Sequence, residues 1–153
     1  MASISSAPAE ASVRRARKTV TFTGLAGAGA AGTVALFTTT GRVYIEKMTA
    51  YCTVNLTESG ATSTISVGTA SIVNCLLTAV NAVDLDADEF WVGNQAVLGS
   101  ITTITGGVGN TASSMNKCIS QNIIATIAVA DVTAGALVFD VWYTPITDNG
   151  LLA

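Results

Sequence analysis

The chain has 153 residues, of which 50% are hydrophobic and 11% are charged, and its formal net charge is −3. This length corresponds to about one domain, and the high hydrophobic and low charged content excludes an intrinsically disordered chain. The sequence has no histidine, the residue that most often serves as a general base or a metal ligand. Its three cysteines, Cys52, Cys75 and Cys118, are too far apart for a CxxC zinc motif. Composition therefore disfavours most catalytic and metal-binding classes.

Positive charge is concentrated at the N-terminus. Residues 1–18 carry a net charge of +3 and residues 19–153 a net charge of −6. The first segment has no apolar periodicity, so we predict that residues 1–18 form an extended basic arm and residues 19–153 one domain. A basic arm on an acidic body favours contact with an acidic partner surface, and a solvated terminus without a partner is the alternative. The basic residues of the arm are Arg14, Arg15, Arg17 and Lys18.

Other partner classes fit the sequence less well. The basic cluster lacks interleaved aromatic residues and the body is acidic, so we expect no nucleic-acid partner. No run of about 18 apolar residues is present, so we expect no membrane span. The N-terminus has no hydrophobic signal-peptide core. We therefore expect free, buried thiols rather than disulfides.

β-Branched residues dominate the domain. Thr, Val and Ile account for 49 of the 153 residues, whereas Lys and Glu account for 7. This balance favours strands over helices. Turn residues separate short alternating segments, and residues 71–83 are compatible with either a strand or a short helix. The expected strands are residues 19–23, 33–39, 42–57, 64–69, 90–92, 120–129 and 136–144, with a loose hairpin over 93–114.

Two of these segments carry a specific structural signal. In residues 42–57 the apolar parity changes near Glu46 and Lys47, which predicts a bulge or a bend because strand side chains alternate with period 2. In residues 136–144, alternation predicts that Leu137, Phe139, Val141 and Tyr143 face the core and that Asp140 and Thr144 face outward. About eight strands spaced in this way indicate an all-β sandwich or barrel.

Three motifs suggest chemistry but lack its context. Gly27, Gly29 and Gly32 match the dinucleotide fingerprint, yet a predicted strand follows where that motif requires a helix. The acidic loop from Asp84 to Glu89 lacks the glycine and glutamate positions of an EF-hand, and either a casual cation site or a plain acidic surface remains open. Without histidine no Ser-His-Asp triad can form. We predict a protein that is not an enzyme and uses no cofactor or metal.

The two tryptophans are candidate subunit contacts. Trp142 shares the parity of Asp140 and is therefore expected on the outer face of its strand, where a large apolar side chain favours burial by another subunit. A second covered face within the same domain is the alternative. Trp91 is the other candidate.

The sequence resembles the small virion proteins of tailed bacteriophages. The likeness covers roughly residues 19–150 and lies in GTVALFTTTGRV (residues 32–43), SVGT (66–69), ADVTAGALVFDVWYTPI (130–146) and DNG (148–150). This resemblance implies a jelly-roll-like β-sandwich of the capsid decoration, or cement, type. It further implies a trimer on the outer surface of the capsid, bound to the major capsid protein. The basic arm departs from the family pattern, and we expect it to form the capsid contact.

Two structural roles stand as alternatives to capsid decoration. A phage tail or head-fibre module is the first, although fibres usually carry repeats or coiled-coil segments. A carbohydrate-binding β-sandwich is the second, although sugar platforms use exposed aromatic residues and only nine aromatic residues are present in this chain.

Overall fold

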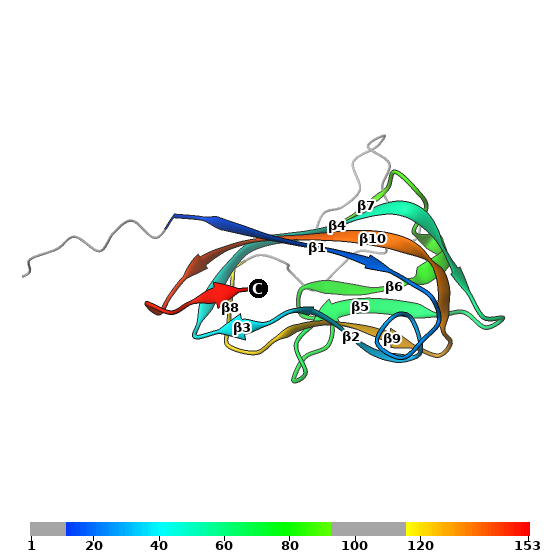
Figure 1. Ribbon diagram of the computed structural model, residues 1–153, viewed down its shortest axis with the longest axis horizontal. Coiled ribbons are helices and arrows are strands. Elements are labelled where there is room, and N and C mark those ends of the chain that lie inside the picture. The colour runs from blue at the N-terminus through cyan, green and yellow to red at the C-terminus, as the bar shows by residue number, and fades with distance from the viewer. Residues whose placement is uncertain (1–11, 93–115) are drawn as a thin grey trace, which may run out of the picture.

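Two antiparallel sheets packed face to face form the body of the protein. The computed structural model describes residues 12–92 and 116–153, and Figure 1 shows the two layers from the side. One layer contains, in spatial order, β1 (Arg14–Thr21), β10 (Val132–Pro145), β4 (Val43–Glu58) and β7 (Phe90–Val92), with β8 (Lys117–Ile119) also paired to β4. The other contains β2 (Gly32–Phe37), β9 (Ile123–Ala128), β5 (Thr64–Gly68) and β6 (Leu77–Asn81). The predicted all-β sandwich is confirmed.

Along the described part of the chain, strands are separated by turns and loops. The elements are β1 (Arg14–Thr21), β2 (Gly32–Phe37), β3 (Thr39–Thr40), β4 (Val43–Glu58), β5 (Thr64–Gly68), β6 (Leu77–Asn81), the 3₁₀ turn η1 (Ala82–Asp84), β7 (Phe90–Val92), β8 (Lys117–Ile119), β9 (Ile123–Ala128), β10 (Val132–Pro145) and β11 (Leu151–Leu152). The hairpin predicted over 93–114 lies outside the described residues.

Strand pairing is nested from the outside of the sequence inward. β1 pairs with β10, β2 with β9, β4 with both β7 and β8, and β5 with β6, in every case antiparallel. These pairs resemble one long hairpin wrapped over on itself, and the additional pairing of β4 with β10 and of β5 with β9 completes the two sheets. β10 is thereby placed in the interior of its sheet, between β1 and β4.

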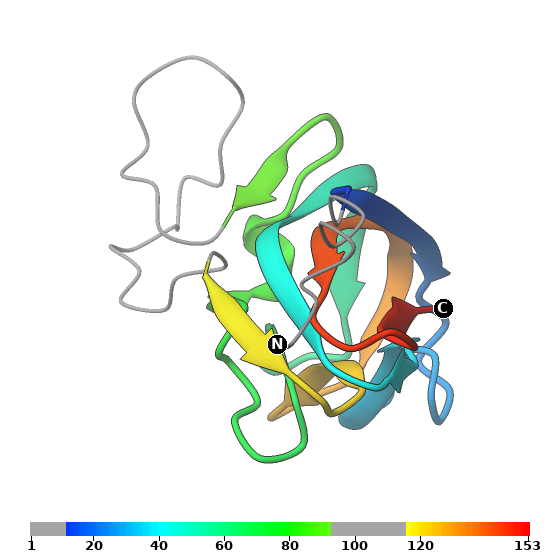
Figure 2. The same cartoon turned by 90° about the vertical axis from the view of Figure 1, so that its left-hand side faces the viewer.

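The core lies between the two sheets, where Figure 2 shows them curling around it. The four residues of β10 predicted to face inward, Leu137, Phe139, Val141 and Tyr143, are at most 2% exposed. They meet the inward side chains of β9 and β5 from the other layer within one hydrophobic cluster. The strict alternation in β10 fixes its inner face because a strand turns successive side chains to opposite sides.

The predicted irregularity in the longest strand is a β-bulge at Glu46. Trp142 pairs with Lys47 while Tyr143 pairs with Ile45, so Glu46 is the extra residue on β4. Its side chain accepts a hydrogen bond from the Thr144 hydroxyl at 2.9 Å. The parity change in the sequence therefore records a real change of register.

Residues 71–83, for which the sequence left a strand or a short helix open, contain β6, and η1 follows it directly over Ala82–Asp84. The strand predicted over residues 120–129 ends at Ala128: Val129 continues the apolar alternation of Ile123, Ala125 and Ile127, but it is 75% exposed and has a φ of 77°. It lies in the turn between β9 and β10, where this left-handed backbone turns its side chain away from the core.

Candidate functional site on the outer face of the larger sheet

The outer face of the β1-β10-β4-β7 sheet carries charged and aromatic side chains in register. In one row Arg15 of β1 stands opposite Trp142 of β10, which stands opposite Lys47 of β4. In the next row Arg17 stands opposite Asp140. Strand alternation places these side chains on the same side of the sheet, away from the core.

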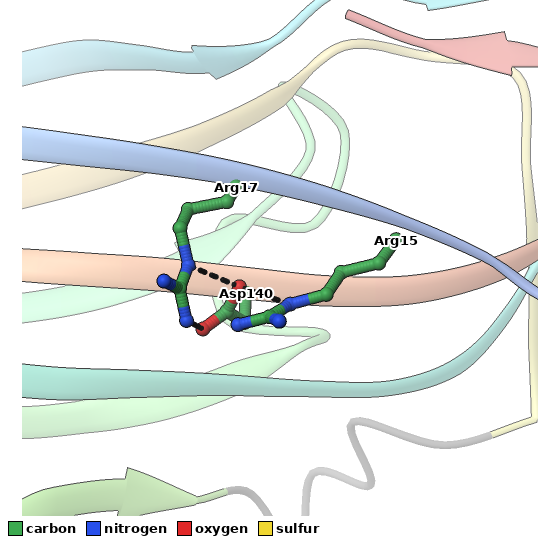
Figure 3. A network of polar contacts seen from close by, with 3 residues as sticks. All are labelled: Arg15, Arg17 and Asp140. Atoms are coloured by element: carbon green, nitrogen blue, oxygen red, sulfur yellow. Dashed lines mark hydrogen bonds and ion pairs between the residues drawn. The ribbon is translucent and has the colours of Figure 1, made fainter.

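Asp140 accepts hydrogen bonds from two arginines of β1 (Figure 3). The Arg15 Nε donates to Oδ1 at 2.7 Å, and Arg17 donates from Nε to Oδ1 at 2.9 Å and from Nη2 to Oδ2 at 2.8 Å. The Arg17 contact is therefore bidentate, the stronger form of an arginine–carboxylate pair. We call Arg15, Arg17 and Asp140 the Asp140 network. It fastens β1 to the middle of β10.

The Asp140 network holds its carboxylate ionised although the side chain is only 9% exposed. Burial alone would raise the pKa of Asp140. The hydrogen bonds from Arg17 and Arg15 and their positive charges outweigh it, so the pKa of Asp140 falls to about 2. One carboxylate thus serves two guanidinium groups, and the network keeps a net positive charge.

Trp142 faces outward as its parity predicts, and cations cover part of its ring. The Arg15 guanidinium carbon lies 5.2 Å and the Lys47 ammonium nitrogen 4.2 Å from the ring centroid. Both distances are within the range of a cation–π interaction. The half-buried Trp142 ring therefore supports two positive charges on this face, and its role as a subunit contact stays a prediction.

The basic residues assigned to the arm belong to the sandwich. β1 begins at Arg14, so the sheet already includes Arg14, Arg15, Arg17 and Lys18, and the predicted boundary at residue 18 is corrected. The reason is the Asp140 network, which ties this basic segment to β10. Alternation places Arg14 and Lys18 on the side opposite Arg15 and Arg17. Both are exposed, and within the described residues neither forms an ion pair.

Trp91 does not fit its predicted role as a subunit contact. It lies on β7 opposite Ala50 and is 2% exposed. Its ring belongs to the hydrophobic core between the sheets. The tryptophan is buried because β7 turns it toward the core, while its neighbour Phe90 on the outer face is 40% exposed.

Carboxylates of the acidic loop bind neighbouring groups of the protein. Asp86 accepts a hydrogen bond from the Asn55 amide at 3.0 Å, and Asp88 accepts one from the Tyr51 hydroxyl at 2.6 Å. Glu89 accepts one from the Asp86 backbone N–H at 3.1 Å. Across residues 12–92 and 116–153, no three Asp, Glu, Cys or His side chains are grouped to hold a metal ion. These contacts fix the acidic loop against β4 through Asn55 and Tyr51.

A small cavity lies between the β5–β6 loop and β8. It has a volume of about 260 Å³ and is lined by Thr69, Ser71, Ile72, Cys75, Lys117, Cys118, Ile119, Ser120 and Gln121. Ligand pockets usually range from roughly 300 to 1,000 Å³, so this cavity is small for an organic ligand.

All three cysteines are free, but only Cys52 is buried, while Cys75 is half-buried and Cys118 exposed. The expectation of three buried thiols is therefore wrong for two of them.

Sequence reasoning missed the pairing of Arg15 and Arg17 with Asp140 and the contact of Lys47 with Trp142. Two signals were present. Arg15 and Arg17 are spaced by two, which places both on one face of a strand. Asp140 is a lone acid in an apolar central strand, where a charge requires a partner.

In comparisons with protein family models, curated proteins and solved structures, nothing matched this chain. Among the described residues no helix is long and apolar enough to span a membrane.

Proposed function

We propose that the protein is a phage capsid decoration protein that binds the major capsid protein on the outer surface of the shell and stabilises it. The observation that carries the proposal is the basic strand β1, exposed at the edge of an otherwise acidic body. The nested strand order supports a jelly-roll form of the sandwich, an architecture common in viral capsid proteins. The absence of histidine supports a structural role over an enzymatic one.

Decoration would stabilise the shell by multivalent binding. In a homotrimer, three basic strands would contact the shell at once, so that modest contacts add through effective concentration. A protein that binds only the assembled shell shifts the equilibrium toward that shell. The exposed charges of Arg14 and Lys18 would supply attraction that weakens as the salt concentration rises.

Labelling of purified particles tests the proposed location. Antibody raised against the folded chain, visualised with gold on particles from the source lysate, is expected to cover the heads uniformly. Label confined to tails would replace decoration with the fibre or tail module. Absence of label from all particles would contradict a virion role, and the carbohydrate-binding sandwich would then be tested on a glycan array.

The role of β1 in shell binding is tested with charge substitutions rather than with a truncation. Removing residues 1–18 would also remove most of β1 and leave Asp140 without its arginines, so the sheet itself would be damaged. Arg14→Glu combined with Lys18→Glu leaves the Asp140 network intact. We expect this double variant to fold and to sediment with shells at least tenfold more weakly, a loss of about 1.4 kcal/mol. Binding at full strength would contradict a role for the basic strand.

A further inference from the structure

β1 is an edge strand with an open side. It pairs only with β10 among the described strands, and six of its eight residues are exposed. An edge strand presents unpaired backbone N–H and C=O groups that can accept another strand. Proteins usually protect such an edge with charged side chains, bulges or proline. β1 runs in unbroken register with β10 and contains no proline, so its protection comes from its charged side chains.

The backbone groups that point outward can be assigned. Beyond the end of β1, the Phe22 N–H donates to the Gly135 carbonyl on the β10 side at 2.9 Å. In an antiparallel ladder, bonded and non-bonded pairs alternate, so Val20, Lys18 and Ala16 also bond toward β10. The free edge is then formed by the N–H and C=O groups of Arg15, Arg17, Thr19 and Thr21.

The Asp140 network holds this open edge in a fixed conformation. Arg15 and Arg17, whose side chains bind Asp140, are two of the residues whose backbone groups face outward. A strand that is already extended loses less conformational freedom when it binds a partner, and this favours affinity.

Charge selects the kind of strand that can bind. β1 carries Arg14, Arg15, Arg17 and Lys18, against which the network supplies one carboxylate. A second copy of β1 would bring basic side chains next to basic side chains, and like charges across adjacent strands are destabilising. An acidic strand would instead place carboxylates next to these basic side chains, and opposite charges across adjacent strands are stabilising.

We propose that the free edge of β1 binds an extended acidic segment of a partner protein by β-strand addition. The backbone of Arg15, Arg17, Thr19 and Thr21 supplies the hydrogen bonds, and the side chains of Arg14 and Lys18 supply the selectivity for acidic residues. This inference deepens the proposed function and rests on it only for the identity of the partner, which would be the major capsid protein.

Amide hydrogen exchange tests the proposal with a defined probe. The probe is an eight-residue peptide of alternating glutamate and valine, added to the full-length protein at low salt. We expect slower exchange of the Arg17 and Thr19 amides, which face outward, and little change at Lys18 and Val20, which already bond to β10. Failure of the peptide to bind, or protection confined to other strands, would overturn the proposal.

Two pairs of variants separate strand addition from general charge attraction. Thr19→Pro removes one outward N–H, and proline is tolerated where the N–H of an edge strand faces solvent. Thr19→Ala is its control and keeps the donor. Lys18→Glu is expected to weaken peptide binding roughly tenfold, whereas Lys117→Glu on β8, which is separated from β1 by β10 and β4, is expected to change it less than twofold. Equal losses in Thr19→Pro and Thr19→Ala, or in Lys18→Glu and Lys117→Glu, would contradict strand addition.

Binding to shells separates this inference from the proposed function. Peptide binding with no binding to shells would leave the strand edge supported and overturn the capsid role. Full shell binding by Thr19→Pro and by Lys18→Glu would leave the capsid role supported and overturn binding through the strand edge. The two proposals therefore fail by different results.

Discussion

Replacing Asp140 by asparagine should destabilise the protein in a pH-dependent manner. The substitution keeps the shape of the side chain and a hydrogen-bond acceptor but removes the charge that pairs with Arg15 and Arg17. Folding lowers the pKa of Asp140 from 3.8 to about 2, which corresponds to about 2.4 kcal/mol at 1.36 kcal/mol per pKa unit. The side chains of Arg15 and Arg17 are 45% and 56% exposed, so solvent screening reduces the expected loss to about 1–2 kcal/mol.

The sign of the pH dependence follows from the direction of the pKa shift. A carboxyl whose pKa is lowered by folding contributes its full stability above its unfolded value of 3.8, and this contribution is lost as the pH falls toward 2. We expect the free energy of unfolding of Asp140→Asn, measured by urea denaturation, to lie about 1–2 kcal/mol below wild type at pH 7. The gap should close near pH 2.

A matched control distinguishes the network from a general loss of negative charge. Asp148 is exposed and forms no ion pair within the described residues. Asp148→Asn should therefore leave the free energy of unfolding within about 0.5 kcal/mol of wild type. A gap for Asp140→Asn that is equally large at pH 7 and pH 2.5 would refute the electrostatic reasoning and indicate lost packing instead.

Three further results should follow from the packing. Gly135 has a φ of 111° and lies against the backbone of β4, so Gly135→Ala should cost about 3 kcal/mol by chemical denaturation. Gly60→Ala, at a φ of 79° in open space, should cost about 1–2 kcal/mol, and equal losses would argue against a close approach at Gly135. Burial raises the pKa of Cys52 to about 11, so at pH 8 a maleimide should label the exposed Cys118 and spare Cys52 until the protein unfolds, as peptide mapping would show. Trp91→Ala should cost about 3–5 kcal/mol in the same denaturation assay, and a loss below 1 kcal/mol would place Trp91 outside the core.

Alternation in the sequence predicted the sheets because burial and strand geometry follow from the same pattern. In β10, four apolar residues at every second position identified the inner face, and all four are buried. The change of parity near Glu46 identified a bulge. Such features depend on the local sequence and on the alternation of apolar residues, and both can be read from one sequence.

The candidate site was less predictable because it depends on pairing between distant strands. The side chains of Arg15 and Asp140 meet across a sequence separation of 125 residues, and no local pattern specifies that register. Charge composition alone made residues 14–18 look like a solvated arm. Parity placed Trp142 on the outer face of its strand, whereas no pattern in the sequence showed that the pairing of β7 with β4 buries Trp91.

The nested strand order also affects the timing of folding. β10 is the last long strand of the chain, yet it lies between β1 and β4 in its sheet. During synthesis β1 therefore leaves the ribosome early and waits for a partner that appears near the end of translation. Contacts of such long sequence separation close slowly, and unpaired strands are exposed to aggregation in the meantime. The positive charges of β1 would oppose pairing between the β1 strands of two nascent chains during this wait, so the same residues that line the open edge in the folded protein would also limit its self-association before the chain folds.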